Sequence, residues 1–224
     1  MKNYILIFSF LLGCFSFNSC ELDDYQEPNA EVSGQIIDAI TGNPLQSEQP
    51  EGFQIRLLEE GYTDPNIFWG MADGNFMNTR LFPYTYTVMP TNGPFIDPEP
   101  QTVTLPKTGM TFTVQPYTNV SGTASIQGGI FNYSVNLKKG AGVKITELVI
   151  IVCENNPRVC MSTYSFRGIQ NVSEISDDEL VSMTHTGSIN NYAPAAGRTY
   201  YVRFAAKTSS SARYNYSEPI RLTN

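Results

Sequence analysis

The sequence predicts an all-β protein: two β-sandwich domains in tandem behind an N-terminal signal peptide. Three observations predict this fold class. Apolar residues recur at every second position in many short segments, as in strands that bury one face. Gly and Pro, with 17 and 14 residues, separate these segments as turns do. No stretch of useful length shows the helical period, so strands dominate the prediction.

Composition and charge limit the classes of function. The 224 residues suit one large domain or two small ones, and 41% hydrophobic residues are enough for real cores. The net charge of −7 speaks against a nucleic-acid partner, which requires a basic surface. A single histidine, His185, excludes metal sites built from several histidines.

Residues 1–19 have the three-part form of a secretory signal peptide. A basic residue at position 2 precedes an apolar run over residues 5–17, which is too short to span a bilayer. The following segment, Phe-Asn-Ser-Cys at residues 17–20, resembles the bacterial lipobox, in which cleavage precedes the Cys and its thiol is acylated. We expect lipidation of Cys20. The alternative is an ordinary secretory signal with an incidental Cys.

Residues 20–30 predict an acidic tether. Acidic and polar residues follow Cys20 directly, a composition that does not pack into a core. These acidic residues also resemble the export signal of surface lipoproteins in Bacteroidetes. That resemblance implies a protein that the lipid holds in the outer membrane, facing the outside of the cell.

Residues 31–117 predict the first sandwich. Apolar residues alternate over 32–38, 53–58, 84–88 and 110–114, and residues 103–105 add a short strand. Gly42 and Pro44 belong to one predicted turn. Asp73 and Gly74 form a sharp reversal that requires a positive φ.

The motifs of this segment resemble the carboxypeptidase-regulatory-like domain, a transthyretin-like β-sandwich. They are Val32-x-Gly34-x-Ile36-x-Asp38, Thr41-Gly42-x-Pro44-Leu45, Ala72-Asp73-Gly74-x-Phe76 and Tyr84-x-Tyr86-x-Val88. The resemblance implies a fold in which the Tyr/Val alternation fills the core. It implies no catalysis.

A longer pattern resembles the DUF3823 family. It comprises residues 52–62 followed by Phe68-Trp69-Gly70-x-Ala72-Asp73-Gly74-x-Phe76-x-Asn78-Thr79. Members are Bacteroidetes outer-surface lipoproteins of two β-domains, and their genes usually lie beside SusC/SusD-type glycan-uptake pairs. The resemblance covers nearly the whole mature chain and supplies no catalytic residues.

Residues 118–224 predict a fibronectin-III/Ig-like sandwich. Strands are expected over 120–126, 131–137 and 146–152, the last of them central. Residues 197–208 and 214–222 resemble the last two strands of a fibronectin type III module. Tyr200 then occupies the position of the tyrosine corner, whose hydroxyl bonds upstream backbone. Ser176 predicts the N-cap of a short helical turn.

Cys153 and Cys160 flank a predicted turn that contains Asn155, Asn156 and Pro157. If residues 148–152 and 161–166 pair as a hairpin, the two sulfurs face each other. Export favours oxidation, so a disulfide between them is expected. The alternative is two free thiols that pack as small hydrophobes.

The candidate carbohydrate-binding residues are Tyr62, Asp64, Asn66, Phe68 and Trp69. Sugars stack an apolar face on an aromatic ring, while amides and carboxylates take the hydroxyls. Strand alternation cannot place both Phe68 and Trp69 outward. The alternative is therefore that these rings fill the edge of the first core or the seam between the domains.

No catalytic, cofactor or metal motif stands out. His185 has no nucleophile elbow, and the carboxylates at 59–60 and 177–179 are adjacent rather than a spaced pair. No CxxC, phosphate loop or EF-hand spacing is present in the sequence. We expect a non-enzymatic surface lipoprotein, without cofactors, that binds polysaccharide or assists SusC/SusD-like proteins. The alternative is a structural or adhesive protein with protein–protein contacts.

Overall fold

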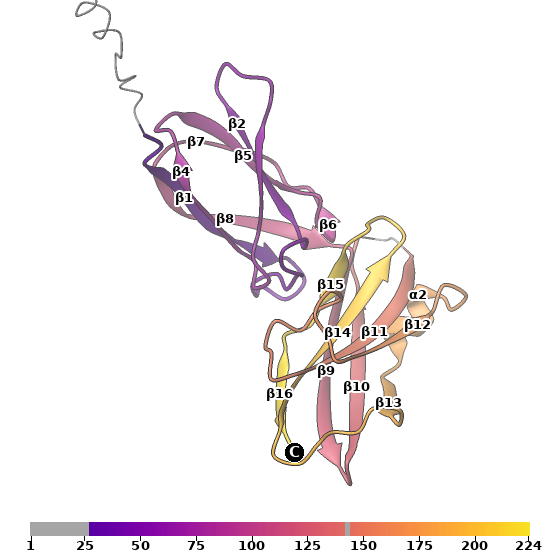
Figure 1. Ribbon diagram of the computed structural model, residues 1–224. Helices are drawn as coiled ribbons and strands as arrows, with labels where there is room; N and C mark the ends of the chain where they lie inside the picture. The colour runs from indigo at the N-terminus through magenta and orange to yellow at the C-terminus, as the bar shows by residue number, and fades with distance from the viewer. Residues whose placement is uncertain (1–26, 142–143) are drawn as a thin grey trace, which may run out of the picture.

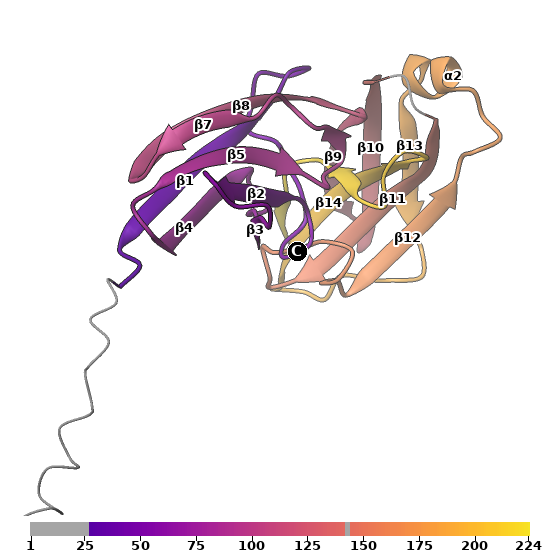
Figure 2. The same cartoon turned by 90° about the horizontal axis from the view of Figure 1, so that it is seen from above.

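The computed structural model describes residues 27–141 and 144–224. Two β-sandwiches follow one another, joined end to end (Figures 1 and 2). The predicted all-β fold class is thereby confirmed. The signal peptide, Cys20 and most of the tether lie outside the described residues, so the predictions about them stay predictions.

None of the helices that the structure describes is long and apolar enough to cross a membrane.

The first sandwich consists of two four-stranded sheets. One sheet has the order β4-β1-β8-β6, with β1 (Ala30–Asp38), β4 (Asn75–Leu81), β6 (Phe95–Ile96) and β8 (Lys107–Pro116). In it, β1 runs parallel to β8 and antiparallel to β4. The other is antiparallel with the order β3-β2-β5-β7, from β2 (Gln54–Glu59), β3 (Asn66–Trp69), β5 (Thr85–Thr91) and β7 (Gln101–Thr104).

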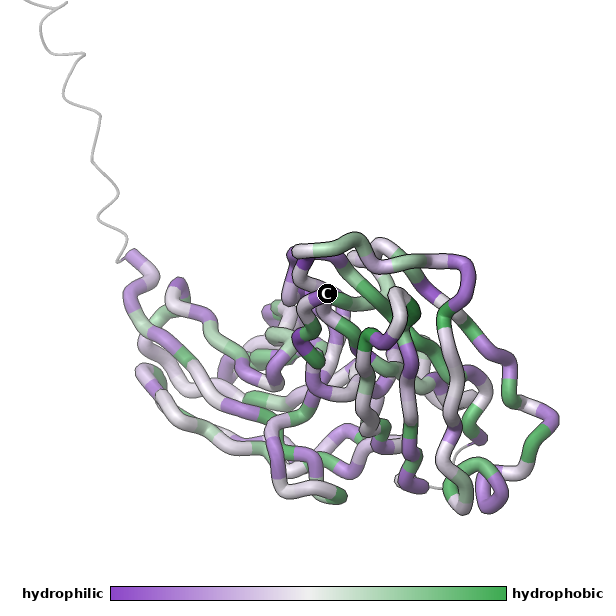
Figure 3. The backbone as a smooth tube through the Cα atoms, turned by 90° about the horizontal axis from the view of Figure 1, so that it is seen from below, coloured by the Kyte–Doolittle hydropathy of each residue, from purple (hydrophilic) through white to green (hydrophobic). Residues whose placement is uncertain are grey.

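The core of the first sandwich follows from the alternation in its strands, which is visible along the backbone in Figure 3. Ile55, Leu57 and Val88 of one sheet are fully buried in the same cluster as Ile36 and Phe112 of the other. Gly74 adopts a φ of 80°, as the predicted reversal requires.

The second sandwich pairs a three-stranded with a five-stranded sheet. The smaller has the order β13-β10-β9, with β9 (Thr118–Gln127), β10 (Ile130–Lys139) and β13 (His185–Ile189). The larger has the order β12-β11-β14-β15, with β16 also on β14. Its strands are β11 (Ile145–Glu154), β12 (Phe166–Asn171), β14 (Thr199–Thr208), β15 (Tyr214–Tyr216) and β16 (Ile220–Thr223).

Strand β11 is buried on both faces, as expected of a central strand. Ile150 and Val152 pack into the main core of the second sandwich, while Val149 and Ile151 join a separate cluster on the opposite face. The predicted tyrosine corner is confirmed, because the buried Tyr200 hydroxyl accepts a hydrogen bond from the Ala195 amide at 2.8 Å.

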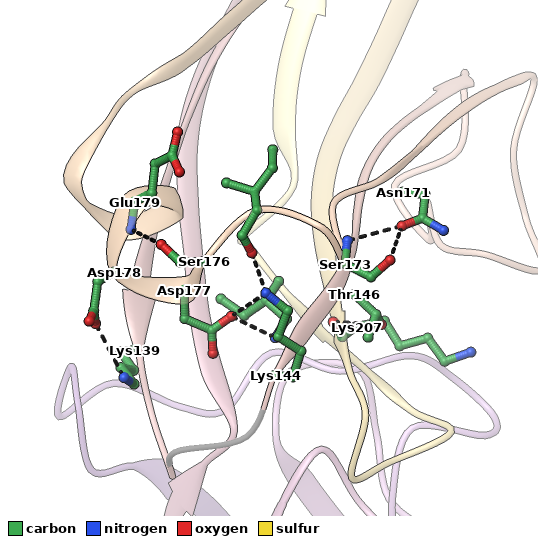
Figure 4. Close-up of polar contacts among 12 residues, drawn as sticks. Lys139, Lys144, Thr146, Asn171, Ser173, Ser176, Asp177, Asp178, Glu179 and Lys207 are labelled. Carbon is green, nitrogen blue, oxygen red and sulfur yellow. Dashed lines mark hydrogen bonds and ion pairs between the residues drawn. The ribbon is translucent and has the colours of Figure 1, made fainter.

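Helix α2 (Asp177–Ser182) begins at the predicted cap: Ser176 Oγ accepts from the Glu179 amide at 3.2 Å. Its acidic residues bind neighbouring groups (Figure 4). The Asp177 carboxylate accepts from the Ile145 amide at 3.1 Å and lies 3.6 Å from Lys144 Nζ, which also donates to the Ile175 carbonyl. The Asp177 carboxylate therefore anchors the start of the helix to the sandwich.

The predicted disulfide between Cys153 and Cys160 is not formed in this structure, where both are buried free thiols. The hairpin has a different register from the expected one, since Val152 pairs with Phe166 rather than with a residue nearer the turn. Cys160 lies instead in a tight turn, where its backbone amide and carbonyl bond those of Thr163. The residue opposite Cys153 on the neighbouring strand β14 is Tyr201.

A buried arginine joins the two sandwiches. Arg203 of β14 is 3% exposed, and its guanidinium donates to the Ser217 carbonyl within the second sandwich at 2.7 Å. The same group donates across the seam to the Ser47 carbonyl at 2.9 Å and to Gln46 Oε1 at 3.2 Å. Two charge-assisted hydrogen bonds from one guanidinium therefore fix the two sandwiches to each other.

Candidate functional site

A groove of about 290 Å³ opens at one end of the first sandwich. It is formed by the turn between β2 and β3, the end of β4 and the start of β5. In Figures 1 and 2 this is the end at which the chain enters β1, away from the second sandwich. The lining residues are Pro28, Leu57, Glu59, Tyr62, Asp64, Asn66, Arg80, Leu81, Phe82 and Tyr86.

Exposed aromatic rings gather at this groove. Tyr62 is 66% exposed and Phe82 39% exposed, and both line it. Phe82 also stacks on the 50% exposed Tyr84, with ring centres 5.9 Å apart and planes 25° from parallel. Large apolar side chains left in solvent in this way indicate a binding surface, because their burial by a ligand is favourable.

A fixed acid–phenol pair forms the inner part of the groove. Tyr86 is 4% exposed, and its hydroxyl donates to Glu59 Oε2 at 3.2 Å. Burial of the phenol, together with the nearby Glu59 carboxylate, raises the pKa of Tyr86 to about 12. Tyr86 therefore stays protonated at neutral pH. Within the described residues, Glu59 Oε1 has no hydrogen-bond partner and is free to accept from a ligand.

Asp64, Asn66 and Arg80 supply the remaining polar groups of the wall. All three are exposed, and Arg80 forms no ion pair within the part of the chain that the structure describes. Carboxylates accept, guanidinium donates and an amide does both. The aromatic rings can stack on the apolar face of a sugar, and these polar groups can bind its hydroxyls.

The structure divides the predicted binding segment. Tyr62, Asp64 and Asn66 line the groove, whereas Phe68 packs against the first core. Trp69 lies at the seam, with the Arg213 guanidinium 5.0 Å from its ring centre. Phe68 and Trp69 therefore follow the alternative that the sequence left open, in which these rings fill the edge of the first core and the seam between the domains. The reason is the alternation of β3, which turns Phe68 inward opposite Ile55.

Two aromatic residues at the groove, Phe82 and Tyr84, are not among the candidate residues predicted from the sequence. Phe82 and Tyr84 flank a proline in the turn between β4 and β5, and two aromatic residues in a turn are the signal that could have found them. Tyr84 was expected in the core, but it is exposed. Tyr86 is buried as expected.

The single histidine has a structural contact. His185 Nε2 lies 2.9 Å from the Leu180 carbonyl, so its ring bonds the end of α2. Among the described residues, no group of three or more His, Cys, Asp or Glu side chains is arranged to hold a metal ion.

Fold and groove together define a protein of two β-sandwiches with an aromatic and polar groove at the end of the first. Solved structures share this fold. A DUF3823 family protein from Bacteroides uniformis is 23% identical with a TM-score of 0.75, covering 88% of this chain and 99% of its own. A second, from Parabacteroides merdae, is 22% identical with a TM-score of 0.72, covering 88% of this chain and 100% of its own.

A third solved structure is that of a candidate carbohydrate binding protein from Bacteroides uniformis. It is 21% identical with a TM-score of 0.70, covering 88% of this chain and 100% of its own. No protein-family model and no curated protein matches the sequence. The chain therefore has the fold of DUF3823 family proteins over most of its length, and the resemblance predicted from the sequence is confirmed as a likeness of fold.

Proposed function

We propose that this protein is a non-catalytic lipoprotein of the outer membrane that faces the cell surface and binds polysaccharide in the groove of the first sandwich. The observation that carries the proposal is the gathering of Tyr62, Phe82 and Tyr84 beside the polar groups of that groove. Membrane attachment through Cys20 rests on the lipobox-like sequence.

The groove has the size and chemistry for a short stretch of a glycan chain. Its volume of about 290 Å³ lies at the lower end of the range for small-ligand sites. The Phe82–Tyr84 stack continues from the groove onto the open surface, since Tyr84 is not part of the lining. One sugar in the groove and the next on Tyr84 would suit a polymer better than a free monosaccharide.

Partnership with SusC/SusD-like proteins completes the proposal. One support is the resemblance to the DUF3823 family, whose genes usually lie beside such glycan-uptake pairs. The other is the fold shared with a candidate carbohydrate binding protein. In this role the protein would hold polysaccharide close to the transporter and perform no chemistry on it.

Titration of the purified protein with soluble polysaccharides by calorimetry tests the proposal. We expect saturable binding that weakens about tenfold or more in Tyr62→Ala and Phe82→Ala, because each removes a stacking ring. Tyr164→Ala is the matched control, since Tyr164 is a similarly exposed aromatic of the second sandwich. Failure of every polysaccharide to bind would favour the alternative, a structural or adhesive protein.

A further inference from the structure

We infer that the groove selects neutral glycans over anionic ones, and that Glu59 is the residue that sets this specificity. The inference rests on the proposed carbohydrate binding and names the class of ligand that the same site takes. Three features of the groove lead to it: a carboxylate held in place, the balance of charge on the walls, and the position of the one cation.

The first feature is the fixed position of Glu59. Glu59 ends β2 and lies directly opposite Tyr86 of β5 in the sheet register. The buried phenol of Tyr86 holds Oε2, which leaves Oε1 facing no protein partner within the described residues. A side chain that is ordered before binding loses little entropy when a ligand arrives. Glu59 is thus a ready acceptor for a sugar hydroxyl.

The second feature is charge. The lining contains two carboxylates, Glu59 and Asp64, and one guanidinium, Arg80. The groove is therefore negative, on a protein whose net charge is also negative, at −7. A uronate or sulfate brought beside Glu59 meets repulsion that a hydroxyl does not, and such a repulsive element is how sites reject a wrong ligand.

The third feature is the position of Arg80. It is exposed on the wall, where water and salt screen its attraction for an anion. Glu59 and Tyr86 are less exposed, so the repulsion acts where screening is weaker. A neutral glycan carries several hydroxyls, each of which can donate or accept, so that one can donate to Glu59 and another can accept from Arg80. An anionic group can satisfy only Arg80.

The test uses polymers in matched pairs that differ in charge. The pairs are hydroxyethyl cellulose and carboxymethyl cellulose, dextran and dextran sulfate, and laminarin and laminarin sulfate. Affinity is measured on the full purified protein at low and at physiological salt. We expect at least one neutral polymer to bind and its anionic partner to bind about tenfold or more weakly, with a smaller difference at high salt.

The variant Glu59→Gln separates charge from shape, since the amide oxygen can still accept from Tyr86. We expect it to bind the neutral polymer about tenfold more weakly and to discriminate less against the anionic partner. Glu60→Gln is the matched control, because Glu60 is the next residue, exposed, and absent from the groove lining. Circular dichroism of both variants confirms that each is folded.

Each outcome has a distinct meaning. If only anionic polymers bind, the inference is overturned while carbohydrate binding stands. If Glu59→Gln behaves as Glu60→Gln does, the role of Glu59 is overturned. If no polymer of either class binds, the proposed function itself fails, and the inference with it.

Discussion

The guanidinium of Arg213 lies 5.0 Å from the centre of the Trp69 ring, and the two residues belong to different sandwiches. Arg213 also pairs with Glu51 of the first sandwich, with 3.2 Å between nitrogen and oxygen. A cation over an indole face is favourable, more so where water is partly excluded. The only tryptophan of the chain therefore belongs to the seam between the sandwiches and lies outside the groove.

Trp69 fluorescence should accordingly report on the seam. We expect Arg213→Ala to shift the emission to longer wavelength, because the variant uncovers one face of the ring. Arg167→Ala, which removes a similar contact with Tyr164 in the second sandwich, should leave the emission unchanged. A saturating polysaccharide should also leave it unchanged. A ligand-dependent change that disappears in Tyr62→Ala would contradict the separation of Trp69 from the groove.

Removal of the Arg203 side chain should destabilise the protein. Arg203→Met leaves the Ser217 and Ser47 carbonyls without their buried donor, at a cost of about 3 kcal/mol in the free energy of unfolding. Urea unfolding followed by circular dichroism measures the effect. Arg221→Met, at an exposed position of β16, is the control and should change stability by about 0.5 kcal/mol or less. Equal stability of the two variants would contradict the role of Arg203 in the seam.

Tyr86 should contribute to loss of stability at alkaline pH. Its pKa is raised to about 12 by burial and by the Glu59 carboxylate, so between pH 10 and 12 the phenol ionises in the unfolded chain but stays protonated in the folded one. A raised folded-state pKa means that the stabilisation is complete below pH 10 and is lost as pH rises through 12. The free energy of unfolding should fall by roughly 2 kcal/mol over this range on account of Tyr86.

Comparison with Tyr86→Phe isolates this contribution from those of other tyrosines. The variant should be about 1 kcal/mol less stable at pH 7, since it loses the hydrogen bond to Glu59. The difference between the two proteins should shrink and then reverse as pH rises from 10 to 12. Parallel stability curves across this range would show that the Tyr86 pKa is not raised in the folded protein.

Much of the fold was predictable because its signals are local. The alternation in β2 and β5, the Gly74 reversal and the Ser176 cap each depend on a few neighbouring residues. Tyr200 could be placed because residues 197–208 resemble a fibronectin type III strand in which such a tyrosine bonds upstream backbone, and its hydroxyl does accept from the Ala195 amide. The buried free thiols of Cys153 and Cys160 match the alternative to a disulfide, and the choice between the two depends on hairpin register, which a turn motif alone does not fix.

The groove was only partly predictable because its residues come from three separate segments. Tyr62, Asp64 and Asn66 are close in sequence, whereas Glu59 meets Tyr86 only through the pairing of β2 with β5. Phe82 joins them because the turn between β4 and β5 reaches the same end of the sandwich. Nothing in one sequence states that these segments meet, so Phe82 and Tyr84 could not be joined to the candidate residues at positions 62–69.

The proposed lipid anchor on Cys20 predicts how far the groove lies from the membrane. Pro28 lines the groove and follows Cys20 by eight residues. Eight extended residues span at most about 29 Å, so an acylated Cys20 would keep the groove within that reach of the membrane surface. Polysaccharide bound there would lie close to a transporter in the same membrane.

The test is metabolic labelling with palmitate followed by separation of membrane and soluble fractions. We expect label and membrane association in the wild type and in Cys14→Ala, the matched control within the signal peptide. Cys20→Ala should lose the label, because alanine has no thiol to acylate. Labelled, membrane-bound Cys20→Ala would disprove the anchor, and with it the limit on the distance between groove and membrane.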